Sequence, residues 1–278
     1  MIIWLASYPK SGNTWLRLFL RAYFLPEGKK FSINDEGNQD YETKKFPDHK
    51  MLLDNKINFN KFEEIVKNWI NLQEYINLNN KINFLKTHNG NYNINGFPFT
   101  NSENTLGGVY IVRDPRDVAL SMTNHFNMSI EQAVKNMTNM QHYEFFDKNM
   151  PQGFKISIMG DWSSNYNSWK YYQARKIHLV RYEDMINNSE KTFRNILDYL
   201  SKFLPLKLNN EKIKSALELT SFSNLSSIEN KTGFTEIGSG EKFFRKGEVG
   251  EWKKKLDPKL ANKLEEAFKK EMLELNYL

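Results

Sequence analysis

The chain has 278 residues, of which 40% are hydrophobic and 26% are charged, a composition typical of a globular protein with a sizeable core. It contains no cysteine, which excludes a disulfide framework, a thiolate metal site and a cysteine nucleophile. The formal net charge of +6, from 39 basic and 33 acidic residues, favours an anionic partner but does not form a basic tail.

The first residues do not have the pattern of a secretory signal. Residues 1–5 are apolar, but the polar residues 7–10 follow at once, and Arg17 and Arg21 interrupt the next apolar stretch. No window reaches the roughly 20 apolar residues that are needed to span a bilayer. We therefore expect a cytoplasmic protein without a membrane span.

Short apolar runs alternate with amphipathic segments, which is typical of a parallel sheet with crossover helices. In chain order, the first part of the pattern predicts a strand at 2–7, a helix at 14–23, an aperiodic loop with short helical pieces at 26–58 and a helix at 62–73. Strands at 82–86 and 108–112 and a helix at 114–122 follow. The last predicted elements are a strand at 177–180 and helices at 188–203 and from 257 onwards. The last helix is expected to bury Leu260, Leu264, Phe268 and Leu275. Because there is no linker and no internal repeat, we expect one α/β domain over residues 1–278, with a central parallel sheet flanked by helices.

The segment SYPKSGNTW at residues 7–15 lies between the first predicted strand and the first predicted helix. A small turn with glycine at this place lets backbone N–H groups converge, and the helix N-terminus adds a partial positive charge. Lys10 adds a full charge, and Ser11 and Thr14 add hydroxyl donors. The segment predicts an anion-binding loop, although the Walker A spacing is absent. The alternative is an ordinary turn with a solvated lysine.

A second segment, FLKTH at residues 84–88, ends another predicted strand, and ligands bind at the carboxyl ends of strands in open α/β folds. Lys86 and His88 are two residues apart, so both point to the same side of an extended strand. A cation beside an imidazole disfavours the imidazolium form and keeps His88 available as a base. The alternative is a structural histidine.

Two further segments carry cations at predicted loop positions. Arg113 ends a strand and offers a bidentate fork for a phosphate, and Ser121 lies two turns into the next helix; an ion pair of Arg113 with Asp114 or Asp117 is the alternative. The segment FFRKGEVGEW at residues 243–252 describes a flexible basic loop able to close on an anion, or else a solvated surface turn.

In this order the four segments resemble the motifs of the sulfotransferases that use 3′-phosphoadenosine 5′-phosphosulfate (PAPS), the cytosolic type in particular. That family has a Y-P-K-x-G-x-x-W loop for the 5′-phosphosulfate, K-T-H after a later strand, R-[DN]-P-x-D-x-x-x-S for the 3′-phosphate and a R-K-G-x-x-G-[DE]-W loop. Residues 8–15, 86–88, 113–121 and 245–252 match them, and residues 181–184 and 220–222 resemble the adenine-side segments. The resemblance implies a P-loop-like strand–loop–helix phosphate-binding start.

The resemblance also implies the reaction, which is in-line transfer of a sulfuryl group from PAPS to a hydroxyl or amine of a small-molecule, lipid, glycan or natural-product acceptor. It implies His88 as the general base, with Lys10 and Lys86 neutralising charge on the bridging oxygen and the leaving phosphate. The residues implied to bind PAPS, or its product PAP, are Lys10, Ser11, Gly12, Asn13, Thr14, Trp15, Arg113, Ser121, Tyr182, Thr220, Phe222, Arg245, Lys246 and Gly247.

The chain departs from the family pattern at three places. Asn13 stands where many relatives have threonine, and Glu251 stands where aspartate is commoner. The K-x-x-x-T-V motif, through which many animal members dimerise, is missing after Trp252, so the oligomeric state stays open.

The sequence fits two other classes of protein less well. A P-loop kinase would need ATP and Mg²⁺, but no Ser or Thr of the P-loop type and no obvious acidic cluster is present, so we expect no metal. A nucleic-acid partner is not expected, because the cations do not interleave with aromatic residues along a groove. The acceptor should be set by residues 26–58, 124–160 and 223–243. Their aromatic residues predict an apolar pocket or simply core: Phe31, Phe46, Phe126, Tyr143, Phe145, Phe146 and Phe154.

Overall fold

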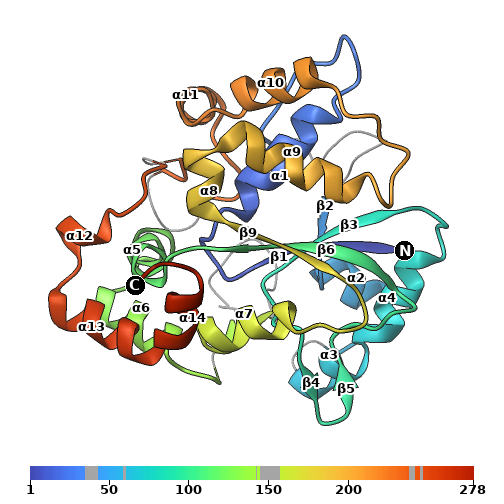
Figure 1. Cartoon of the computed structure of the whole chain (residues 1–278). Helices are drawn as coiled ribbons and strands as arrows, with labels where there is room; N and C mark the ends of the chain where they lie inside the picture. The colour runs from blue at the N-terminus through green and yellow to red at the C-terminus, as the bar shows by residue number, and fades with distance from the viewer. Residues whose placement is uncertain (35–42, 59–60, 142, 145–156, 238–241, 245–246) are drawn as a thin grey trace. The chain divides into compact units, whose positions relative to one another are not determined.

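A five-stranded sheet in the order β2-β3-β1-β6-β9 organises the structure, a computed structural model that describes residues 1–34, 43–58, 61–141, 143–144, 157–237, 242–244 and 247–278 (Figure 1). Its strands are β1 (Ile2–Ser7), β2 (Thr43–Lys45), β3 (Asn83–Thr87), β6 (Thr105–Val112) and β9 (Ile177–Arg181). β3 pairs in parallel with both β1 and β2. The predicted α/β fold, with a central parallel sheet flanked by helices, is confirmed.

The strands that were predicted from apolar runs are β1, β3, β6 and β9. All six residues of β1 are buried, as expected for a parallel strand that is covered on both faces. β2 was missed, because the sequence TKK has no apolar pattern and two of its three residues are exposed. Its pairing with β3, and not its own side chains, makes this segment a strand.

The helices are α1 (Asn13–Tyr23), α2 (His49–Asp54), α3 (Phe62–Lys67), α4 (Trp69–Asn77), α5 (Pro115–Phe126), α6 (Ile130–Met137), α7 (Trp162–Lys170), α8 (Tyr182–Asn187), α9 (Ser189–Leu200), α10 (Asn210–Leu219), α11 (Phe222–Thr232), α12 (Trp252–Lys255), α13 (Pro258–Ala267) and α14 (Lys269–Glu274). Four short strands complete the described elements: β4 (Asn93–Ile94), β5 (Phe97–Pro98), β7 (Tyr143–Glu144) and β8 (Ser157–Ile158).

Two predicted helices are each divided in the structure. The pattern at 62–73 forms α3 and α4, which are separated at Asn68, where the side-chain amide donates to the Glu64 carbonyl at 2.7 Å. An amide side chain that bonds the preceding turn competes with continued helix. The last predicted helix is divided into α13 and α14 at Phe268, and Leu260, which was expected to be buried, is half-buried.

The chain divides into two compact units. The first comprises Met1–Tyr8, Thr43–Tyr110 and Asn139–Leu179, and the second comprises Pro9–Glu42, Ile111–Thr138 and Val180–Leu278. The first holds β1, β2, β3 and most of β6 and β9, whereas the second holds α1, α5, α6 and α8 to α14. That residues 1–278 act as one domain stays a prediction.

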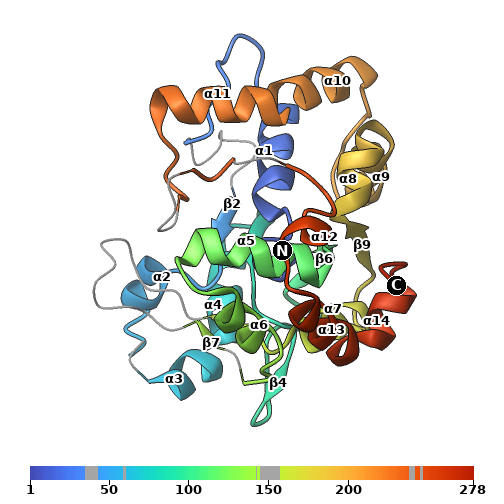
Figure 2. The ribbon, with the colours of Figure 1, turned by 90° about the vertical axis from the view of Figure 1, so that its left-hand side faces the viewer.

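Each unit has its own aromatic core. In the first, the Trp4 ring contacts Phe46, Phe99 and Trp169, with ring centres 5.1–6.0 Å apart. In the second, α1 packs against α10 and α10 against α9 (Figure 2). The ring centres of Phe19 and Phe193 are 4.1 Å apart. Trp4 belongs to β1 and Phe19 to α1, so each of these elements is anchored in the core of its own unit.

Candidate functional site

The loop before α1 has a backbone that only a small residue can adopt. Gly12 has φ +105°, and a Cβ built on it would lie 2.6 Å from Cδ2 of Tyr182. Lys10 is also in the left-handed region, with φ 63°. Glycine adopts a positive φ without strain, whereas for Lys10 it costs about 1–3 kcal/mol, and such strained residues cluster at ligand-binding sites. The chain therefore maintains a strained loop against the Tyr182 ring.

The same loop fits an anion. The Ser11 hydroxyl is fully buried, and it has no hydrogen-bond partner among the described residues. A buried hydroxyl with no partner in the protein is uncommon, and a bound ion or an ordered water can supply the missing partner. α1 has no acidic residue in its first turn and no side-chain cap, so none of the helix's own residues balances the partial positive charge at its N-terminus. Ser11 and the start of α1 together suit a phosphate group.

Asn13 and Thr14 begin α1, and both are engaged within the second unit. The Asn13 side-chain oxygen accepts from Arg17 Nε at 3.1 Å. The Thr14 hydroxyl donates to Oε2 of Glu236 at 3.1 Å and accepts from Nη2 of Arg17. The sequence did not single out Glu236 or Arg17 for this site.

Arg113 follows β6 and lies over the Tyr182 ring, with Cζ 4.4 Å from the ring centre. Its two Nη atoms donate to the carbonyls of Lys10 and Glu248 at 3.2 and 3.3 Å. Asp114 forms an ion pair with Arg116 at 2.7 Å. The sequence had suggested Arg113 as a possible partner of Asp114. Arg113 thus connects the Lys10 loop with the segment around residue 248.

Asp117, the other carboxylate considered for Arg113, anchors that same segment. Its two oxygens accept from the backbone N–H groups of Gly250 and Trp252 at 2.7 and 3.0 Å. Burial raises the pKa of Asp117, and the charge of Arg113 offsets part of this. Ser121, one helical turn further along α5, is half-buried.

Gly247 and Phe222 lie together in the second unit. Gly247 has φ +63°, and a Cβ there would lie 2.7 Å from Cδ2 of Phe222, so the ring leaves no room for a side chain. Arg245 and Lys246, which were also predicted to bind the nucleotide, lie outside the described residues.

Trp15 and Thr220 are joined by a hydrogen bond from the Trp15 indole N–H to the Thr220 carbonyl at 2.9 Å. The Trp15 ring lies edge-on to Tyr182, with the ring centres 6.3 Å apart. Thr220 is fully buried and its hydroxyl donates to the Ala216 carbonyl at 2.6 Å. Their contacts with adenine stay predictions.

His88 and Lys86 belong to the first unit. Both are half-buried, whereas Leu85 and Thr87 are buried, so Lys86 and His88 share one side of the chain as predicted. Nδ1 of His88 lies 2.8 Å from the Ser7 carbonyl oxygen. Because a carbonyl can only accept, Nδ1 carries the proton, and Nε2 holds the lone pair in the neutral ring. This tautomer suits a base that acts through Nε2.

The comparison with protein families decides among the classes weighed on the sequence. The sulfotransferase domain model matches residues 2–276. The chain belongs to the sulfotransferase family. Because the family uses PAPS as its donor, the protein is a PAPS-dependent sulfotransferase.

Two curated relatives of this sulfotransferase have fewer than a third of their residues in common with it, but they cover nearly all of it. Flavonol 3-sulfotransferase of Flaveria bidentis is 29% identical, over 95% of this chain and 79% of the relative. Cytosolic sulfotransferase 1 of Arabidopsis thaliana is 28% identical, over 94% and 75%. The solved structure of mouse sulfotransferase SULT7A1 complexed with PAP shares the fold, with a TM-score of 0.62, 20% identity and coverage of 98% of this chain and 84% of that one.

Two residues near the sulfotransferase's predicted nucleotide site were not singled out on the sequence. Glu183 accepts from the Asp114 backbone N–H at 3.0 Å and from the Tyr277 hydroxyl at 2.8 Å. Burial raises the pKa of Glu183, and these bonds oppose the rise. Glu183 lies in the RYED segment that was noted as a weak family match, but nothing in the local sequence pointed to Tyr277.

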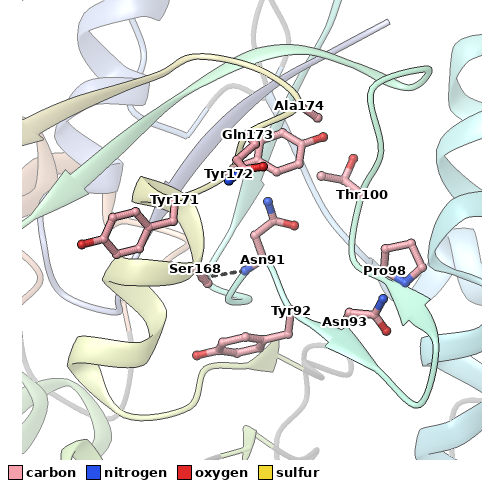
Figure 3. Close-up of a pocket in the computed structure, with 10 residues that line it drawn as sticks. All are labelled: Asn91, Tyr92, Asn93, Pro98, Thr100, Ser168, Tyr171, Tyr172, Gln173 and Ala174. Atoms are coloured by element: carbon pink, nitrogen blue, oxygen red, sulfur yellow. Dashed lines mark hydrogen bonds between the residues drawn. The ribbon is translucent and has the colours of Figure 1, made fainter.

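The first unit of the sulfotransferase also contains an open hollow of about 380 Å³ (Figure 3). Tyrosine rings and amide side chains line most of it. Two of the lining residues are joined by a hydrogen bond, in which the Asn91 backbone N–H donates to the Ser168 hydroxyl at 2.8 Å. The lining residues are Asn91, Tyr92, Asn93, Pro98, Thr100, Ser168, Tyr171, Tyr172, Gln173 and Ala174.

Of the aromatic residues predicted to line an acceptor pocket, those that the structure describes are not among the residues that line that hollow. Phe46 is buried against Trp4 and Phe99 in the core of the first unit, which is the alternative that was weighed. Phe31 packs on the apolar cluster of Leu18 and Phe234. Phe145, Phe146 and Phe154 lie outside the described residues.

Within the described ranges, no three acidic or histidine side chains come close enough together to hold a metal ion. Metal independence of the sulfotransferase stays a prediction. None of the helices in the described part of the chain combines the length and the hydropathy that crossing a membrane requires.

Proposed function

We propose that this sulfotransferase transfers the sulfuryl group of PAPS to a hydroxyl or amine of a small-molecule, lipid, glycan or natural-product acceptor, with residues 1–278 acting as one domain. The observation that carries the proposal is the geometry of the loop before α1. The buried Ser11 hydroxyl has no hydrogen-bond partner among the described residues, and Tyr182 leaves no room for a side chain at Gly12. PAPS supplies the sulfuryl group and a phosphate leaving group.

The nucleotide-binding residues of the proposal all belong to the second unit. Those proposed for the 5′-phosphate are Lys10, Ser11, Gly12, Asn13 and Thr14. Those proposed for the 3′-phosphate are Arg113, Ser121, Arg245, Lys246 and Gly247. Those proposed around adenine are Trp15, Tyr182, Thr220 and Phe222. Support comes from the contacts that join these groups, above all Arg113 on Tyr182 and Tyr182 against Gly12.

The proposed catalytic base, His88, belongs with Lys86 to the first unit. The hydrogen bond from Nδ1 to the Ser7 carbonyl supports this role, because it holds the ring and places the lone pair on Nε2. A general base of this kind contributes about 10²–10⁴ in rate. Lys10 and Lys86 are proposed to stabilise negative charge that develops on the leaving oxygen.

A small-molecule hydroxyl is the acceptor that we would test first. The name of the Flaveria relative, which is 29% identical to this chain, specifies a flavonol, and a flavonol is a small molecule. The name of the Arabidopsis relative, cytosolic sulfotransferase 1, supports the proposal that this chain is also cytoplasmic.

Thermal unfolding with added nucleotides tests the proposal. PAP should raise the melting temperature, because a ligand that binds only the folded state stabilises it by mass action. ATP with Mg²⁺ should raise it less, since ATP lacks the 3′-phosphate proposed to meet Arg113. PAP release from PAPS with a panel of hydroxyl and amine acceptors should persist in EDTA. Stronger stabilisation by ATP with Mg²⁺ than by PAP would favour the kinase class instead.

A further inference from the structure

Glu236 brings a negative charge to the beginning of α1. Its Oε2 accepts from the Thr14 hydroxyl at 3.1 Å, and its two carboxylate oxygens lie 2.7 and 2.6 Å from Nη2 of Arg17. The side chains of Arg17 and Glu236 are only 8% and 22% exposed, so solvent screens this charge little. A carboxylate thus lies where the helix dipole favours an anion.

The chain around Glu236 keeps the carboxylate close to Thr14. Phe234 is buried in a cluster with Leu18, which lies one turn beyond Thr14 on α1. The Thr235 backbone N–H donates to the side chain of Asn34 at 2.9 Å. A group tethered in this way has a high effective concentration at its contact, and it is not diluted as a free anion would be.

The Thr14 hydroxyl has a single proton to donate, and Glu236 receives it. A phosphate oxygen at the same hydroxyl would need that proton, and it would also meet the charge of the carboxylate at short range. The two anions therefore exclude each other at Thr14.

We propose that Glu236 competes with the 5′-phosphate of the nucleotide for Thr14, and that it thereby lowers the affinity for nucleotides that carry this phosphate. The inference rests on the proposed nucleotide-binding function of the loop. It makes Glu236 a determinant of nucleotide selectivity, because a nucleotide without a 5′-phosphate does not have to displace the carboxylate.

Calorimetric titration of the Glu236→Gln variant tests the inference. PAP should bind about tenfold more tightly than to the parent, which corresponds to about 1.4 kcal/mol. Adenosine 3′-phosphate, which lacks the 5′-phosphate, should bind both proteins equally. Glu218→Gln is the matched control, because it removes the same charge from an exposed position on α10 and should change neither affinity.

Each result has a definite meaning. Unchanged or weaker PAP binding by Glu236→Gln, or equal tightening of adenosine 3′-phosphate, would overturn the inference. Glu236→Ala should repeat the gain for PAP if the glutamine variant melts at a different temperature from the parent. If the parent binds PAP but the variants show no selectivity change, only this inference fails. If neither the parent nor the variants bind PAP, the proposed function of the loop is wrong, and the inference is wrong with it.

Discussion

The Arg113 guanidinium stacks on the ring of Tyr182, with its central carbon 4.4 Å from the ring centre. The same ring lies 2.6 Å from the position of a Cβ on Gly12. Tyr182 therefore contacts both the loop proposed for the 5′-phosphate and the arginine proposed for the 3′-phosphate. Its buried ring couples the geometry of the two proposed phosphate sites.

Arg113→Lys should weaken PAP binding while leaving adenosine 5′-phosphate binding nearly unchanged. Lysine keeps the charge but loses the planar fork and the stacking on Tyr182. The loss of a charge-assisted bond is worth about 1.5–3 kcal/mol in binding free energy, measured by titration calorimetry. Arg194→Lys on α9 is the control, and an equal loss for both nucleotides would contradict the 3′-phosphate assignment.

Gly12→Ala should lower both the free energy of unfolding and the affinity for PAP. The alanine Cβ would lie 2.6 Å from Tyr182 in a backbone conformation with φ +105°, at a cost of about 1–3 kcal/mol in urea unfolding. Gly28→Ala is a matched control, because Gly28 also has a positive φ, of +77°, but nothing lies within 4 Å of its Cβ position. Similar losses of PAP affinity in the two variants would show that contact with Tyr182 is not the cause.

His88→Ala should reduce sulfuryl transfer by about 10²–10⁴ and change PAP affinity little. The reason is that His88 is proposed to act on the acceptor, whereas the proposed nucleotide contacts belong to the second unit. Single-turnover kinetics and PAP titration, on a variant that melts like the parent, separate the two effects. A fully active variant would remove the base assignment, and loss of PAP binding would make His88 a structural residue of the nucleotide site.

Glu183→Gln should change how stability depends on pH. Burial raises the pKa of Glu183 above its ordinary value of 4.5, so the folded protein holds this proton more tightly than the unfolded chain does. The carboxyl's contribution to the free energy of unfolding is then fully present below pH 4.5 and declines as pH rises through the raised pKa. In urea unfolding from pH 4 to 8, the free energy of unfolding of the parent should therefore exceed that of the variant by most at acid pH. A parent advantage that grows with pH would mean that the bonds from Asp114 and Tyr277 hold the pKa down.

Local sequence was enough for the elements whose own residues decide their structure. β1 was predicted from a short, continuous apolar run, and in the structure every one of its residues is buried. The helix predicted at 114–122 begins at Pro115 in the structure, and the Asp114 side chain caps it by accepting from the Arg116 N–H. The loop at residues 7–15 and the K-T-H segment could be recognised in the same way, since the residues that carry each motif are neighbours in the chain.

Only the tertiary structure showed the contacts that join distant residues. Glu236 is 222 residues from Thr14, and Tyr277 is 94 residues from Glu183, so no periodicity or spacing in the sequence links either pair. β2 became a strand through its pairing with β3, although its own residues are polar. The physical reason is the same in each case. Backbone pairing and buried hydrogen bonds depend on which groups are brought together by packing, whereas the local sequence pattern indicates only which side chains of one segment can be buried.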